Sequence, residues 1–233
     1  MLEQQCLYHF PIDPFCRKIR FMLALNDVQN CYLRIENFWE KRPTFCKINP
    51  TGTVPLLAVQ KHTPENKKIF TIWGQNTIMD YLRNKYPVFT LLHGDIDERA
   101  KIMKYSEFFD SKFHNDVVKL ILEERVYTFY KKKRVSNVDI IKLARLNLEQ
   151  YLTFIETILK QRDYIATSEF SLADLSLATH ISSLDYLGEI DWTTHTVIKE
   201  WYAIIKSKPA FREILYDIIA DFRPSSWYRE LDF

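Results

Sequence analysis

Hydrophobic and polar positions follow two different periods in the first part of the chain. Short apolar runs with strand-like spacing alternate with stretches in which apolar residues recur every three or four positions. The pattern predicts strands and helices in the order βαβ, a short helix, then ββα, which favours an α/β layer with one crossover and one hairpin. The expected strands are 5–10, 30–35, 54–59 and 69–73, the expected helices are 15–25, 43–48 and 75–85, and 62–68 has turn composition.

The rest of the chain is helical in period. Apolar residues recur at three- and four-residue spacing from Ile102 to Leu120, a pattern typical of helices that pack in a core. Further helices are expected at 140–159, 171–187, 193–206 and 209–219. The fold class is therefore α/β plus all-α. The expected domains are an α/β domain at 1–86, a linker at 87–98 and a helical domain at 99–233 that ends in an aromatic tail, 221–233.

Composition narrows the functional classes. The 233 residues carry a formal net charge of +2, too small to indicate a nucleic-acid partner. Only four glycines are present, and no stretch matches a glycine-rich phosphate loop. No segment has about 18 consecutive apolar residues or a signal-peptide pattern, so we expect a cytoplasmic protein without a membrane span. Cysteine and histidine spacings match no CxxC or metal site, so we expect reduced thiols and no metal.

One helix start is marked by a capping box. Ser171 stands three residues before Asp174, and Phe170 precedes them at the position of a hydrophobic staple. In such a box each side chain bonds the backbone of the other residue. We therefore expect Ser171 and Asp174 to have a structural role at the start of an apolar helix.

Three motifs resemble glutathione S-transferases of bacteria, in order and with the expected spacing. Residues 14–20 resemble the first helix of that family, 49–56 its loop into a cis-proline strand, and 78–82 its third helix. The capping box also matches. The resemblance covers the whole chain. It implies a thioredoxin-like N-terminal domain, a C-terminal helical bundle and a homodimer.

A narrower resemblance points to the FtsZ-localised protein A group of bacterial division proteins. It rests on 39–42, 108–114, 184–192 and the closing 227–233. In that group the fold is implied to bind the tubulin-like protein FtsZ, in the bacterial cytoplasm at the division site, rather than to conjugate glutathione. FtsZ is therefore the expected partner.

The position that activates glutathione in the family holds an acid here. Family enzymes stabilise the thiolate with Ser, Cys or Tyr, and the resemblance puts Asp13 at that position. A hydrogen bond to a charged group contributes roughly 1.5–3 kcal/mol. A carboxylate ~4 Å from a thiolate instead repels it by about 4 kcal/mol at an effective dielectric of 20. Only a protonated Asp13, with a strongly raised pKa, can donate, whereas an ionised Asp13 suits the cap of the following helix.

The remaining candidate site residues form a partial glutathione site. The resemblance implies a backbone contact from Val54 if Pro55 is cis, a geometry that also serves folding alone. Before the third helix, Gly74 offers no side chain, which leaves Gln75 and Asn76.

Cys16 is a further candidate nucleophile, because a position in the first turn of a helix lowers a thiol pKa. A lone cysteine there also suits a packed residue. No catalytic residue is assigned, and no cofactor is expected, although glutathione stays open.

Large apolar side chains gather in the tail. Trp227, Tyr228, Leu231 and Phe233 follow a segment that cannot continue a helix comfortably. They either fold back on the chain or bind a partner, and Trp39 poses the same choice. The leading hypothesis is a glutathione S-transferase-like protein without efficient transferase activity that binds FtsZ filaments. The alternative is a glutathione-dependent transferase or thiol oxidoreductase.

Overall fold

The computed structural model describes residues 3–62, 67–86, 91–132 and 134–231. The chain forms two compact units, Met1–Thr90 and Leu91–Phe233, and each is described by itself. Residues 87–90 of the expected linker and 63–66 of the expected turn lie outside the described residues. Among the residues that are described, no helix is both long and apolar enough to cross a membrane.

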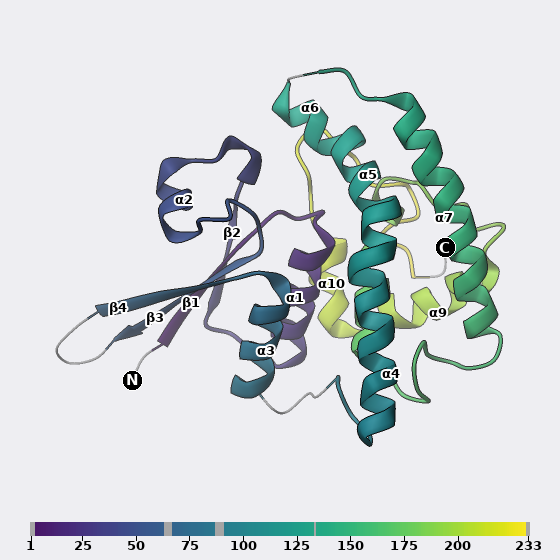
Figure 1. The fold of residues 1–233 in the computed structure, drawn as a ribbon, viewed down its shortest axis with the longest axis horizontal. Helices are drawn as coiled ribbons and strands as arrows, with labels where there is room; N and C mark the ends of the chain where they lie inside the picture. Colours follow the sequence, from purple (N-terminus) through teal and green to yellow (C-terminus); the bar gives the residue numbers. More distant parts are fainter. Residues whose placement is uncertain (1–2, 63–66, 87–90, 133, 232–233) are drawn as a thin grey trace. The chain divides into compact units, whose positions relative to one another are not determined.

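The N-terminal unit is a four-stranded mixed sheet with helices (Figure 1). Its strand order is β2-β1-β3-β4, with β1 parallel to β2 and the other neighbours antiparallel. The predicted order βαβ, short helix, ββα is confirmed. The elements are β1 (Glu3–His9), α1 (Pro14–Leu25), β2 (Cys31–Ile35), η1 (Phe38–Glu40), α2 (Pro43–Ile48), β3 (Leu56–His62), β4 (Lys67–Trp73) and α3 (Gln75–Lys85).

The core of this unit lies between the sheet and the helix pair α1 and α3, which pack side by side (Figure 1). Alternate residues of β1 and one face of α3 are buried, as amphipathic elements require. Helix α1 is buried more completely, at every position from Cys16 to Leu23. The buried apolar residues include Leu7, Leu57 and Val59 from the sheet and Ile19, Phe21, Ile78 and Leu82 from the helices.

The C-terminal unit is helical. It begins with one continuous helical run: α4 (Ile96–Glu107), η2 (Phe108–Val118), α5 (Lys119–Leu122), η3 (Glu123–Tyr127) and α6 (Thr128–Lys131). Figure 1 shows α4 to α5 as one long helix that bends toward α6. Segments η2 and η3 have wider π-type turns, in which an amide bonds the carbonyl five residues earlier, as Lys119 does with His114. The remaining helices are α7 (Val138–Leu159), α8 (Leu172–Tyr186), α9 (Thr196–Lys206) and α10 (Pro209–Leu215).

Helix α8 is the centre of this unit. Every residue from Ala173 to Tyr186 is buried, and the helix packs against α4 and η2. The capping box at its start is present: Asp174 Oδ2 accepts hydrogen bonds from the Ser171 backbone N–H at 3.0 Å and from the Ser171 hydroxyl at 2.9 Å. Asp174 Oδ1 accepts from the Ile165 N–H at 2.8 Å and from Trp201 Nε1 at 3.2 Å. One carboxylate therefore joins three segments of the chain.

The expected helix at 209–219 is too long. Helix α10 ends at Leu215, and the chain reverses in a tight turn in which the Phe222 amide bonds the Ile219 carbonyl at 3.1 Å. The Tyr186 hydroxyl holds this turn by accepting from the Ile219 amide and donating to the Phe222 carbonyl. Asp221 adopts a φ of 64°, the left-handed conformation required at the third turn position. Tertiary bonds thus override the local helical pattern.

We predict that Asp174→Ala lowers the free energy of unfolding by at least about 3 kcal/mol, because it leaves several buried donors without an acceptor. Ser171→Ala is the matched control. It removes a single capping hydroxyl and costs about 1 kcal/mol. Urea unfolding monitored by circular dichroism measures both, and equal losses for the two variants would contradict this role of Asp174.

Candidate functional site

Three segments of the N-terminal unit meet at one end of the sheet, where strands β1, β3 and β4 begin or finish. The Cα partners Tyr8, Leu56 and Trp73 form one row across β1, β3 and β4. The loop after β1, the dipeptide before β3 and the start of α3 therefore lie at the same end of the sheet. These segments carry the sequence-predicted residues Asp13, Val54, Pro55, Gln75 and Asn76.

Asp13 caps helix α1. Its Oδ1 accepts the Cys16 backbone N–H at 2.9 Å, and Pro14 occupies the first helical turn. Burial raises the pKa of Asp13 to about 6, against the opposing effects of hydrogen bonds from Cys16 and Phe15 and of the Arg17 charge. Near neutral pH the carboxyl is therefore mostly ionised and accepts rather than donates. A group in this state repels a neighbouring thiolate.

Cys16 is a poor nucleophile in this fold. Its side chain is completely buried, and burial followed by the neighbouring Asp13 charge raises the pKa of its thiol well above the usual value. The expectation that the helix N-terminus lowers this pKa is wrong, because desolvation and the acidic cap outweigh the helix dipole.

The loop before β3 is organised by one buried amide that sequence reasoning did not single out. Asn49 Nδ2 donates to the Thr53 carbonyl at 2.5 Å, and Asn49 Oδ1 accepts from the Thr51 hydroxyl at 2.7 Å. The Val54–Pro55 peptide bond that follows is cis. Side-chain bonds within the loop therefore hold its shape. The Asn–Pro–Thr–Gly composition is a turn signal that could have indicated this.

Helix α3 starts without a side-chain cap. Its N-cap residue is Gly74, with a φ of 84°, which has no side chain to bond the first amides of the helix. Gln75 is half-buried and Asn76 is exposed. Amides at a helix start attract a carboxylate, and Gly74 offers no side chain that would compete for them.

Trp39 packs within the N-terminal unit. It is half-buried in η1, and its ring meets the Phe10 ring edge-on at 4.9 Å and the Phe38 ring at 5.3 Å. Because Phe10 directly follows β1, Trp39 lies beside the same end of the sheet. Part of its surface stays accessible to a partner.

The tail of the C-terminal unit is tied to α8. Asp185 Oδ1 accepts hydrogen bonds from Trp192 Nε1 at 2.9 Å and from Trp227 Nε1 at 3.0 Å, while the Ser225 hydroxyl bonds the Asp185 carbonyl at 2.8 Å. Lys206 Nζ lies 3.8 Å from Asp185 Oδ2, and both side chains are fully buried. Burial lowers the pKa of Lys206 to about 8, although Asp185 and Glu230 oppose that shift. A buried acid thus holds the tail through the Trp227 indole, and the segment between α8 and α9 through the Trp192 indole.

The tail folds back on its own chain, and Tyr228 is an interior residue. It is 0% exposed, its ring lies 5.1 Å from the Tyr186 ring, and its hydroxyl donates to the Ile214 carbonyl at 3.3 Å. Its assignment to an exposed docking surface is therefore wrong. Leu231 is 38% exposed and Trp227 is half-buried. Phe233 lies outside the described residues.

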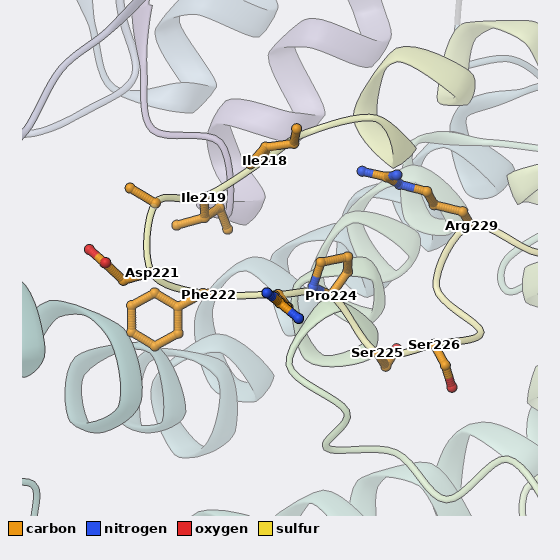
Figure 2. A pocket seen from close by; sticks show the side chains of 10 residues that line it. Ile218, Ile219, Asp221, Phe222, Pro224, Ser225, Ser226 and Arg229 are labelled. Atoms are coloured by element: carbon orange, nitrogen blue, oxygen red, sulfur yellow. The ribbon is translucent and has the colours of Figure 1, made fainter.

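Two cavities flank the tail. One of about 580 Å³ is lined by a single looped segment, 218–226, together with Arg229 (Figure 2). The other, of about 490 Å³, is lined by residues 188–193, Lys199 and Trp227. Trp227 thus lines a cavity while its indole N–H donates to the buried Asp185 carboxylate. An indole fixed in this way is a preorganised contact for a partner side chain.

The comparisons with known proteins agree with this geometry. Glutathione S-transferase models match the chain, the N-terminal domain at residues 14–85 and the C-terminal domain at residues 138–203. FtsZ-localized protein A of Caulobacter vibrioides is 32% identical over 234 residues, covering 100% of both chains. The solved structure of a glutathione S-transferase from Rhodospirillum rubrum F11 has a TM-score of 0.88 at 31% identity and covers 99% of this chain and 100% of that chain. The structure of FzlA from C. crescentus has a TM-score of 0.89 at 30% identity, with the same coverage.

The order of the elements and the sheet topology define a protein with a thioredoxin-like domain followed by a helical domain. This chain belongs to the glutathione S-transferase family. FtsZ-localized protein A is a relative along its full length.

We predict that Asp13→Asn leaves the protein as stable or more stable at pH 7, because Asn keeps the cap without burying a charge. The folded-state pKa of Asp13 is raised, so its ionised form costs stability above about pH 6, and this cost disappears as the pH falls toward the unfolded value near 4. The advantage of Asp13→Asn over the wild type should therefore grow from pH 4 to pH 7, to at most about 3 kcal/mol.

Asp13→Ala is the matched control. It also removes the charge but loses the cap, so it should be less stable than Asp13→Asn by about 0.5–2 kcal/mol at every pH. Chemical denaturation across this pH range measures all three proteins. A wild type whose advantage over Asp13→Asn increases with pH would contradict the raised pKa.

Proposed function

We propose that this protein is an interaction protein that binds FtsZ filaments in bacterial cell division and lacks efficient glutathione transferase activity. The observation that carries the proposal is Asp13, an ionised helix cap at the position where sulfur activation needs a proton donor. The full-length relationship to FtsZ-localized protein A supports the choice of partner.

The tail is the proposed contact surface. Trp227 is held by Asp185 while it lines a cavity, and Leu231 presents an exposed apolar side chain beyond it. Binding energy concentrates in such aromatic and apolar anchors, which bind best when they are already ordered. Trp39 is a second proposed contact, on the N-terminal unit.

The remaining features of the proposal follow from the family. The protein is proposed to act as a homodimer in the cytoplasm, at the division site, without a nucleic-acid partner. The small formal charge of +2 supports the last point, because nucleic-acid binding rests on clustered positive charge.

We predict that the full-length protein pellets with FtsZ filaments assembled with GTP, and that Leu231→Asp lowers its apparent affinity about tenfold. A charge at an apolar anchor loses packing and must be desolvated. Leu146→Asp is the matched control, because Leu146 is also an exposed leucine but lies on α7. Thermal melts confirm that both variants fold.

Two outcomes would contradict this proposal. One is a wild-type protein that stays in the supernatant at every salt concentration. The other is an equal loss of pelleting for Leu231→Asp and Leu146→Asp, which would remove the tail from the contact.

The alternative function is a glutathione-dependent transferase or thiol oxidoreductase, favoured by the ordered loop into cis-Pro55 and the uncapped start of α3. We predict that calorimetric titration with glutathione gives no binding in the micromolar range. Micromolar binding that is lost in Gln75→Ala and retained in Asn84→Ala, a change at the far end of α3, would favour the enzyme.

A further inference from the structure

Strand β2 forms an edge of the sheet and is covered on neither face. Within the described sheet it pairs with β1 alone. Its side chains are exposed on both faces: Tyr32 is 62%, Leu33 44% and Ile35 57% exposed. An exposed, apolar edge strand is a template for pairing with another strand.

The backbone of β2 directs alternate residues to the open edge. The Asn30 carbonyl accepts the Gln5 amide, and the Glu36 amide donates to the His9 carbonyl, so the even-numbered residues bond β1. The odd-numbered residues Cys31, Leu33 and Ile35 therefore point their N–H and C=O groups away from β1.

One antiparallel register between two copies of β2 uses all three of these residues. With Leu33 opposite Leu33 of the second copy, Cys31 faces Ile35 twice, and each of these pairs exchanges two backbone hydrogen bonds. If the centre of the pairing moves from Leu33 to Tyr32, only two pairs of residues exchange backbone hydrogen bonds, each between Cys31 and Leu33. If the centre moves to Arg34, two pairs again form, each between Leu33 and Ile35. This register also sets Arg34 opposite Arg34 of the second copy, which the like charges disfavour.

The side chains are complementary in the same register. On one face each Tyr32 lies opposite the Arg34 of the other copy, in a non-hydrogen-bonded pair where side chains approach most closely. Arg34 already lies over the Tyr8 ring, with its guanidinium carbon 5.2 Å from the ring centroid. A guanidinium between two tyrosine rings is attracted to both. On the other face, Leu33 packs against Leu33 of the second copy, and each Ile35 packs against the Cys31 opposite it.

From this complementarity we propose that β2 is a self-association surface, which pairs antiparallel with β2 of a second copy of this chain in the register centred on Leu33. The contact is isologous, since the same strand serves both copies. It is independent of FtsZ binding. A second two-fold contact elsewhere on the protein would link copies into an open chain.

The test is register-specific cross-linking of the full-length protein. One batch carries Tyr32→Cys and another, isotopically labelled, carries Arg34→Cys. Mixed and oxidised, they should give a disulfide between position 32 of one batch and position 34 of the other, at least tenfold above the 32–32 and 34–34 products. The mixed pair keeps one native tyrosine–arginine contact. Ile69→Cys, exposed on the opposite edge strand, is the control.

A second variant separates pairing from folding. Leu33→Pro removes an N–H that faces the open edge, where proline is tolerated, so the fold should persist. Introduced into both batches, it should lower the 32–34 yield at least tenfold, whereas Leu33→Ala, which keeps the N–H, lowers it less. A 32–34 yield no higher than the Ile69→Cys control, a dominant 32–32 or 34–34 product, or an unchanged yield with Leu33→Pro would each overturn the proposal.

Discussion

The hydrogen bond between the Asp13 carboxylate and the Cys16 amide is the constraint on which the functional account depends. It starts α1 and commits the acid to a structural role. It also places a negative charge at the position that the family resemblance assigns to the donor for the thiolate, and this charge helps to raise the pKa of the Cys16 thiol. One side chain therefore caps the first helix, and under the proposed function it also opposes both candidate routes to sulfur chemistry, a nucleophilic cysteine and a hydrogen-bond donor.

The helical unit uses a buried carboxylate in a comparable way. Asp185 collects two indole N–H groups and lies beside Lys206, so the chain after α10 is fixed to the C-terminal end of α8. Removing one partner of such a cluster leaves a buried charge without compensation. The cluster explains how a segment without regular structure keeps Trp227 oriented. An ordered tail loses less conformational entropy on binding than a free one.

Sequence patterns predicted the elements better than the contacts between them. The helices 43–48 and 75–85 match the structure residue for residue, because Pro43 and Gly74 mark their starts. The helix at 209–219 was overextended, since its end is set by the Tyr186 hydroxyl, which is distant in sequence. Asp13 was correctly considered as a cap, because a cap is a local signal. Asn49 and Asp185 were missed as organisers, because burial and long-range partners cannot be derived from spacing. Tyr228 was assigned to a surface for the same reason.

The most direct test is a steady-state assay of conjugation between glutathione and an electrophilic aryl halide, with the wild type, Asp13→Asn and Asp13→Ser compared. The account predicts that the wild type and Asp13→Asn do not exceed the uncatalysed rate, because neither offers a hydroxyl or thiol donor to the thiolate. Robust conjugation by the wild type that disappears in Asp13→Asn would contradict it.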